Sequence, residues 1–143
     1  MSEYSHLAPL SKQQRSQLVQ AAQSVANRAY APYSHFQVGA AVLTETGQIF
    51  GGCNVENASY GLAICAERAA IFAAIAQEGG ANFQIRAIAV VHANRLPLSP
   101  CGACRQVIAE FGPDAEVIFS TAEGEISVSM TELLPHSFRL DPL

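Results

Sequence analysis

The sequence contains no tryptophan, only two methionines and few charged residues. Aspartate, glutamate, lysine and arginine together make up 14% of its 143 residues, whereas about a quarter is usual for a globular domain. The eight lysines and arginines are scattered along the chain and the net charge is -4. No basic stripe is therefore available to follow a phosphate backbone, which argues against a nucleic-acid partner.

Long apolar runs are also missing. No segment approaches the ~18 consecutive apolar residues of a membrane-spanning helix. The first residues lack the basic region and apolar stretch of a secretory signal. We therefore expect a cytoplasmic protein with no membrane partner. In that compartment, its four cysteines are more often reduced metal ligands or core thiols than disulfides.

Apolar residues, in contrast, are abundant and make up 50% of the chain. This content is enough for one hydrophobic core, and we expect residues 1–143 to form a single domain. Together with the low charge, it also suggests that some apolar surface is buried between subunits.

Hydrophobic periodicity and turn residues predict helices and strands in alternation. Ser11, with Gln14 three residues later, predicts the start of a helix that runs to about Tyr30. An almost entirely apolar helix follows Cys65, and Thr131 is expected to cap a last turn through Leu134. The other predicted elements are strands at 37–43, 48–52, 85–91, 116–120 and 126–129, a loop at 54–64 and a helix at 102–111. This order predicts an α/β fold with three layers (α/β/α) around a mixed five-stranded sheet.

Three cysteines have the spacing of a metal site. Cys101 and Cys104 form a Cys-x-x-Cys pair, and Cys65 precedes the apolar helix. Three protein ligands are typical of a catalytic zinc ion that leaves one position for water. Two alternatives stay open: Cys53 as a fourth ligand of a structural ion, and Cys101 with Cys104 as a redox pair. The histidines show no ligand spacing, and we expect surface or loop positions for His6, His35, His92 and His136.

Two charged residues follow Cys65 directly. Glu67 can be a general acid and base beside a zinc-activated water, although a glutamate in a first helical turn is also favoured by the helix dipole alone. Arg68 can donate hydrogen bonds to thiolate sulfurs and offset the negative charge of three thiolates. Cys-x-Glu followed by Pro-Cys-x-x-Cys is the pattern of zinc deaminases, with glutamate as the proton carrier.

At this point the chain resembles the small cytidine deaminases that act on free nucleosides. The resemblance extends from about Tyr30 to Phe138. It rests on the segments APYSxFxVGA (31–40), GCNVEN (52–57), CAER (65–68), SPCGACRQ (99–106) and ELLP (132–135). It implies a cytidine deaminase-like fold, one Zn²⁺ per subunit, and hydrolysis of cytidine and 2'-deoxycytidine to uridine and 2'-deoxyuridine with release of ammonia, in pyrimidine salvage.

The resemblance also implies roles for substrate-binding residues. Asn54 and Glu56 would hold the ribose hydroxyls, Phe36 would pack on the pyrimidine and the Ala66 backbone would read the base edge. Taken alone, Asn54 and Glu56 also fit a solvated loop, and Phe36 also fits an ordinary core position. Glu67 would protonate N3 of the base and then the departing amine.

Family members of this length are homotetramers, and the resemblance extends to subunit contacts. Phe138 would enter the active site of a neighbouring subunit, and Tyr60 would lie at the subunit junction. Three alternative functions remain: deamination of a cytosine-nucleoside antibiotic such as blasticidin S, editing of polynucleotides, and a non-catalytic zinc module. The 54–57 run argues against the first, the acidic charge against the second, and the third requires a fourth metal ligand.

Overall fold

The computed structural model describes residues 9–141. Its helices are α1 (Lys12–Ala26), α2 (Ala66–Glu78), α3 (Gly102–Phe111) and α4 (Met130–Leu133). The strands are β1 (Val38–Thr44), β2 (Ile49–Cys53), β3 (Ile85–His92), β4 (Glu116–Thr121) and β5 (Gly124–Ser129), with a short 3-10 turn, η2 (Tyr60–Leu62), before α2. In the described residues, no helix is both long and apolar enough to cross a membrane.

The five strands form one mixed sheet in the order β2-β1-β3-β4-β5. β3 and β4 are parallel, and the other neighbouring pairs are antiparallel. Two parallel strands need a crossover connection, which here runs through α3. The predicted mixed five-stranded sheet is therefore confirmed.

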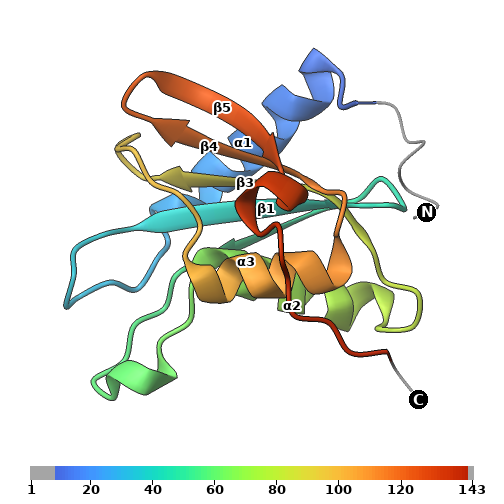
Figure 1. Ribbon diagram of the computed structural model, residues 1–143. Helices are drawn as coiled ribbons and strands as arrows, with labels where there is room; N and C mark the ends of the chain where they lie inside the picture. Colours follow the sequence, from blue (N-terminus) through green and yellow to red (C-terminus); the bar gives the residue numbers. More distant parts are fainter. Residues whose placement is uncertain (1–8, 142–143) are drawn as a thin grey trace.

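The sheet separates two hydrophobic cores, so the fold has the predicted three layers. α1 covers one face and buries Leu18 and Ala22 against Ala41 and Ala89. α2 and α3 lie side by side on the other face (Figure 1). The core on that face contains the alternate residues of the same two strands, such as Ala40, Val42, Ile88 and Val90. This alternation follows from the two-residue period of a strand. It places the starts of α2 and α3 on the same face.

The first helix begins as predicted but ends earlier. The Ser11 side chain accepts from the Gln14 N–H, and the Gln14 side chain accepts from the Ser11 N–H, which completes a capping box. α1 stops at Ala26 rather than near Tyr30, because the Tyr30 backbone bonds to the loop after β2. Its N–H donates to the Asn54 carbonyl at 3.0 Å, and its carbonyl accepts from the Glu56 N–H at 2.8 Å.

Two local predictions were wrong. His92 is the last residue of β3 and is buried, not a surface or loop residue, because it continues the pairing with β1 opposite Val38. The cap of α4 is Ser129 rather than Thr131, since the Ser129 hydroxyl accepts from the Glu132 N–H at 3.3 Å. His35 and His136 are exposed as expected, and His6 lies outside the described residues.

Gly52 fixes the distance between α2 and the sheet. A Cβ atom at this position would lie 2.3 Å from the backbone nitrogen of Ala70. Only glycine allows the helix to approach β2 so closely. Because α2 carries Glu67 and Arg68 in its first turn, this contact also sets their depth below the surface.

Candidate active site

Cys65, Cys101 and Cys104 converge at the starts of α2 and α3. Cys65 and Cys101 are the N-cap residues of these helices, and Cys104 lies in the first turn of α3. Their three sulfur atoms lie within 4.8 Å of one another, with Cys65 Sγ and Cys101 Sγ 4.0 Å apart. A tetrahedral zinc ion with Zn–S bonds of about 2.3 Å places sulfurs about 3.8 Å apart, so this donor set fits zinc.

Cys53 lies outside this group. Within the described residues, the only cluster of metal-ligating side chains that includes a cysteine is the three-sulfur set, and Cys53 remains a free thiol at the end of β2. Three sulfurs leave one position of a tetrahedral ion open, as in catalytic zinc sites.

A neighbouring sulfur and a neighbouring cation favour the thiolate form of Cys65. A hydrogen bond with Cys104 and then the Arg68 guanidinium lower the pKa of Cys65 to about 5, against the opposite effect of partial burial. The same hydrogen bond and burial raise the pKa of Cys104. The arrangement thus favours a thiolate at Cys65, the form in which cysteine binds a metal ion.

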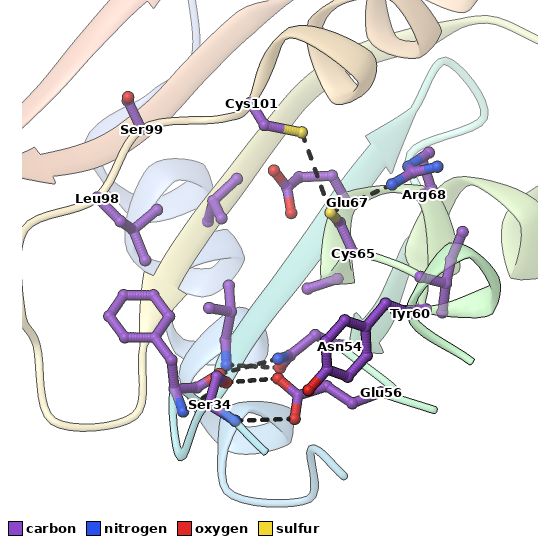
Figure 2. A pocket seen from close by; sticks show the side chains of 16 residues that line it. Ser34, Asn54, Glu56, Tyr60, Cys65, Glu67, Arg68, Leu98, Ser99 and Cys101 are labelled. Atoms are coloured by element: carbon purple, nitrogen blue, oxygen red, sulfur yellow. Dashed lines mark hydrogen bonds between the residues drawn. The ribbon is translucent and has the colours of Figure 1, made fainter. Parts of the chain in front are cut away.

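Arg68 provides the positive charge beside the sulfurs. Its Nη2 donates to Cys65 Sγ at 3.3 Å (Figure 2). The hydrogen bond to Cys65 raises the pKa of Arg68, so the guanidinium stays charged. The pair matches the predicted contact between Arg68 and a thiolate.

Glu67 lies next to the cysteines but belongs to no ligand group. It is buried in the first turn of α2. Burial is the largest effect on its carboxyl group and raises the pKa, and the negative charge of Cys65 acts in the same direction. A carboxyl group whose pKa is raised in this way can both take up and release a proton during a reaction.

These residues close one end of a cleft of about 610 Å³. In Figure 2 the cysteines and Glu67 lie at one end of this cleft, and Asn54 and Glu56 lie at the other. The size suits a nucleoside-sized ligand. The residues that line it and were predicted from the sequence are Phe36, Asn54, Glu56, Tyr60, Cys65, Ala66, Glu67, Arg68 and Cys101.

Hydrogen bonds to the loop before β1 hold Asn54 and Glu56. Asn54 Oδ1 accepts from the Val38 N–H at 2.8 Å, and Asn54 Nδ2 donates to the Phe36 carbonyl at 2.8 Å. Glu56 accepts from the backbone N–H of Tyr33 at 2.9 Å and from the N–H and hydroxyl of Ser34. The Ser34 hydroxyl is the largest influence that lowers the pKa of Glu56, which favours the carboxylate. The two side chains are ordered hydrogen-bonding groups, not parts of a freely solvated loop.

Phe36 lies on the wall of the cleft with His92 behind it. The two ring centroids are 4.4 Å apart. Phe36 is 38% exposed, so it is not an ordinary core residue. The His92 ring is buried, and its Nδ1 accepts from the Asn94 N–H at 2.9 Å. The buried imidazole therefore packs against the Phe36 ring and limits its movement.

Tyr60 and Phe138 occupy different places. Tyr60 lines the cleft and contacts Tyr33 edge to face, with centroids 5.9 Å apart. Phe138 does not line the cleft of its own chain. Its side chain is 67% exposed, and its carbonyl accepts from Gln106 Nε2 on α3 at 2.8 Å.

Several residues of the cleft were not predicted from the sequence. Ser34 and Ser99 are exposed polar residues, and Val38, Val90 and Leu98 supply apolar walls. Arg105 braces the cysteine loop, because its Nε donates to the Pro100 carbonyl at 2.8 Å and its Nη1 to the Leu133 carbonyl at 3.1 Å. Ser34 lies in the 31–40 segment, and Ser99 and Arg105 lie in the 99–106 segment, on which the resemblance to cytidine deaminases rests. Their membership of these segments could have marked them as residues of the site.

Comparison with known proteins gives consistent results. Residues 12–121 match the family model "Cytidine and deoxycytidylate deaminase zinc-binding region". Cytidine deaminases of Halalkalibacterium halodurans and Sporosarcina psychrophila are each 44% identical, over 90% and 88% of this chain and 97% and 92% of their own.

Solved structures show the same relationship. The crystal structure of cytidine deaminase from Burkholderia pseudomallei matches with a TM-score of 0.77 and 45% identity, covering 90% of this chain and all of that chain. The enzyme from Mycobacterium tuberculosis gives 0.76 and 40%, covering 88% and 98%. Since sequence, fold and zinc-binding region all agree over most of its length, the chain belongs to the cytidine deaminase family.

Proposed function

We propose that this protein hydrolyses cytidine and 2'-deoxycytidine to uridine and 2'-deoxyuridine with release of ammonia. One observation carries the proposal: three sulfurs suited to zinc lie beside a buried glutamate that is not one of them, at the closed end of a nucleoside-sized cleft. Deamination of cytidine also follows from membership of the family.

Cys65, Cys101 and Cys104 would hold one Zn²⁺ per subunit. Zinc supplies the Lewis acidity that activates a water molecule for attack on C4 of the base. Glu67 would accept the first proton of the water and deliver it to N3. It would then take the second proton from the hydroxyl group now on C4 and pass it to the exocyclic amine, so that the C4–N bond breaks, the C4 carbonyl forms and ammonia departs. Burial holds the pKa of Glu67 above its usual value, which makes its carboxylate a stronger base toward the water and keeps the carboxyl group protonated until it passes the proton on.

The remainder of the cleft would orient the nucleoside. Asn54 and Glu56, already ordered by the loop before β1, offer a donor and acceptors to the ribose hydroxyls. Phe36 would pack on a face of the pyrimidine. The Ala66 N–H, at the first position of α2, has no partner inside the helix and would read the base edge.

We further propose a homotetramer whose active sites are completed by neighbouring subunits. Exposed apolar side chains near the cleft and on the tail support this assembly, namely Tyr60, Leu62, Phe138 and Leu140. Apolar groups of this size are typical of the buried centre of an interface. Phe138 would then reach the cleft of a neighbour rather than its own.

The setting of the reaction is proposed from the same family relationship. We propose a single-domain cytoplasmic enzyme of pyrimidine salvage that uses free nucleosides. The net charge of -4 supports a small-molecule substrate over a polynucleotide.

Zinc analysis combined with a spectrophotometric assay tests this function. The purified protein should contain one zinc per chain, and ultraviolet absorbance should fall as cytidine becomes uridine. Turnover of blasticidin S without turnover of cytidine would favour the antibiotic-deaminase alternative. Bound zinc with no turnover of either compound would favour a non-catalytic zinc module.

A further inference from the structure

His92 is a buried histidine that the proposed reaction does not use. It is 4% exposed and is not among the residues that line the cleft. Its ring packs on the Phe36 ring at a tilt of 51°, with the two centroids 4.4 Å apart. Phe36 does line the cleft, and it is 38% exposed. His92 can therefore affect a bound ligand only through a neighbour, and Phe36 is such a neighbour.

The backbone on both sides of this ring pair is held in place. The Phe36 carbonyl accepts from Asn54 Nδ2 at 2.8 Å. β1 and β3 pair as far as His92, and directly after it the Ala93 N–H donates to the Gln37 carbonyl at 2.9 Å. The freedom that remains to Phe36 is rotation about its side-chain bonds, and the imidazole occupies the space beside its ring.

The His92 ring is itself held by the turn that follows β3. Its Nδ1 accepts from the Asn94 N–H at 2.9 Å, and its backbone carbonyl accepts from the Arg95 N–H at 2.9 Å. Arg95 closes this turn with a left-handed backbone, at a φ of 61°. Because the imidazole is both buried and hydrogen-bonded, it is a rigid partner for the Phe36 ring.

We infer that His92 is a positioning residue that keeps the Phe36 ring in the orientation that packs on the pyrimidine, an argument that rests on the proposed function. An unsupported phenylalanine can occupy several staggered positions about its first side-chain bond. The apparent affinity for a ligand falls in proportion to the fraction of molecules in the competent position. Packing on the base acts before and during the reaction alike, so its loss raises KM rather than lowering kcat.

Two substitutions separate the ring of His92 from its hydrogen bond. H92F keeps an aromatic ring against Phe36 but loses the acceptor for the Asn94 N–H, whereas H92N keeps an acceptor but loses the ring. H92N should raise KM for cytidine and the dissociation constant of uridine by about threefold or more, with little change in kcat. H92F should stay close to the wild type. The opposite order, or no change in H92N, would overturn the inference.

A double-mutant cycle tests whether His92 acts through Phe36. F36A alone should weaken the binding of uridine, measured by calorimetry. H92N added to F36A should weaken it no further, since the ring that His92 holds is then missing. Equal losses in the two backgrounds would overturn the inference. N94A is the matched control, because it removes an exposed side chain from the same turn and keeps the backbone N–H, and it should bind uridine as the wild type does.

The order of the Phe36 ring in the ligand-free protein separates this inference from the proposed reaction. Fluorophenylalanine labelling gives each phenylalanine a fluorine NMR signal, and F36L identifies the signal of Phe36. Its transverse relaxation should become slower in H92N, because the unsupported ring moves more freely, and should stay as in the wild type in H92F. Absence of cytidine turnover in the wild type would count against the proposed function alone, whereas unchanged relaxation in H92N would count against the role of His92.

Discussion

Arg68 Nη2 lies 3.3 Å from Cys65 Sγ, so a permanent cation contacts one of the three sulfurs of the candidate zinc site. Three thiolates around a divalent ion carry a net charge of -1, which opposes the loss of a proton from a bound water. The two helix N-termini offset part of this charge. Arg68 supplies a full positive charge at the same place.

Replacement of Arg68 by glutamine should shift the acid limb of the pH profile upward. Arg68 helps to lower the pKa of Cys65, so its removal raises that pKa and lets protons compete with zinc at higher pH. We expect the acid limb of kcat/KM to move up by about one pH unit or more. R68K keeps the charge but loses the planar guanidinium group with its several N–H donors. The acid limb of R68K should therefore lie between those of the wild type and R68Q. An acid limb in R68Q that overlays that of the wild type would remove Arg68 from this role.

Cys101→Ser should weaken zinc binding and stability together. Metal binding in such a site contributes directly to the free energy of folding. We expect C101S to hold less zinc after dialysis and to unfold at lower urea concentration. C53S provides the control, because Cys53 is a free thiol outside the sulfur cluster, and it should retain full zinc. Equal zinc loss in C53S would place Cys53 in the site.

Glu116, the first residue of β4, links the segment before α1 and α1 itself to the sheet. It accepts from the Leu10 N–H at 3.3 Å, from Arg15 Nη2 at 3.1 Å and from the Ser127 hydroxyl at 2.7 Å. Partial burial alone would raise the pKa of Glu116, but these hydrogen bonds and the Arg15 charge outweigh it and lower that pKa.

E116Q should therefore lower stability by about 1 kcal/mol at neutral pH. A carboxylate with a lowered folded-state pKa stabilises the fold fully above its unfolded-state pKa of about 4.3, and this stabilisation is lost as pH falls through the folded-state pKa. The difference between wild type and E116Q should thus shrink toward about pH 3 in urea unfolding. E123Q, in the turn between β4 and β5, removes the same charge without these contacts and should change little. A difference that grows with acidity would contradict this assignment.

Local signals were enough to predict most of the fold and the chemical centre. The capping pair Ser11 and Gln14, the apolar helix after Cys65 and the glycine-containing turns all act over a few residues, so they can be read from the chain. The Cys-x-x-Cys spacing and the position of Glu67 two residues after Cys65 are also local signals of this kind.

Long-range contacts could not be predicted in this way. His92 is buried because β3 continues to pair with β1, and Leu98 lines the cleft because its loop bonds to β4. Each depends on a partner far away in the sequence. Ser34 likewise becomes important only when the fold brings it to Glu56.

A mixing experiment tests whether Phe138 completes a neighbouring site. F138A and E67Q should each lose activity as separate proteins. Unfolded together and refolded as mixed oligomers, they should regain part of it, because some sites would combine Glu67 of one chain with Phe138 of another. E67Q mixed with E67Q is the control. Mixed oligomers without regained activity, or a monomeric mass for the wild type, would contradict shared sites.

We propose that Glu67 moves protons beside a zinc ion that three cysteines hold without its help. Glu67→Gln keeps the size of the side chain and removes only its ability to exchange protons. E67Q should bind one zinc per chain, as the wild type does, and should deaminate cytidine at least about 10² to 10⁴ times more slowly. Zinc content and cytidine turnover measured on the same E67Q preparation decide the matter: full zinc with lost turnover is the predicted result, and full zinc with undiminished turnover would contradict the account.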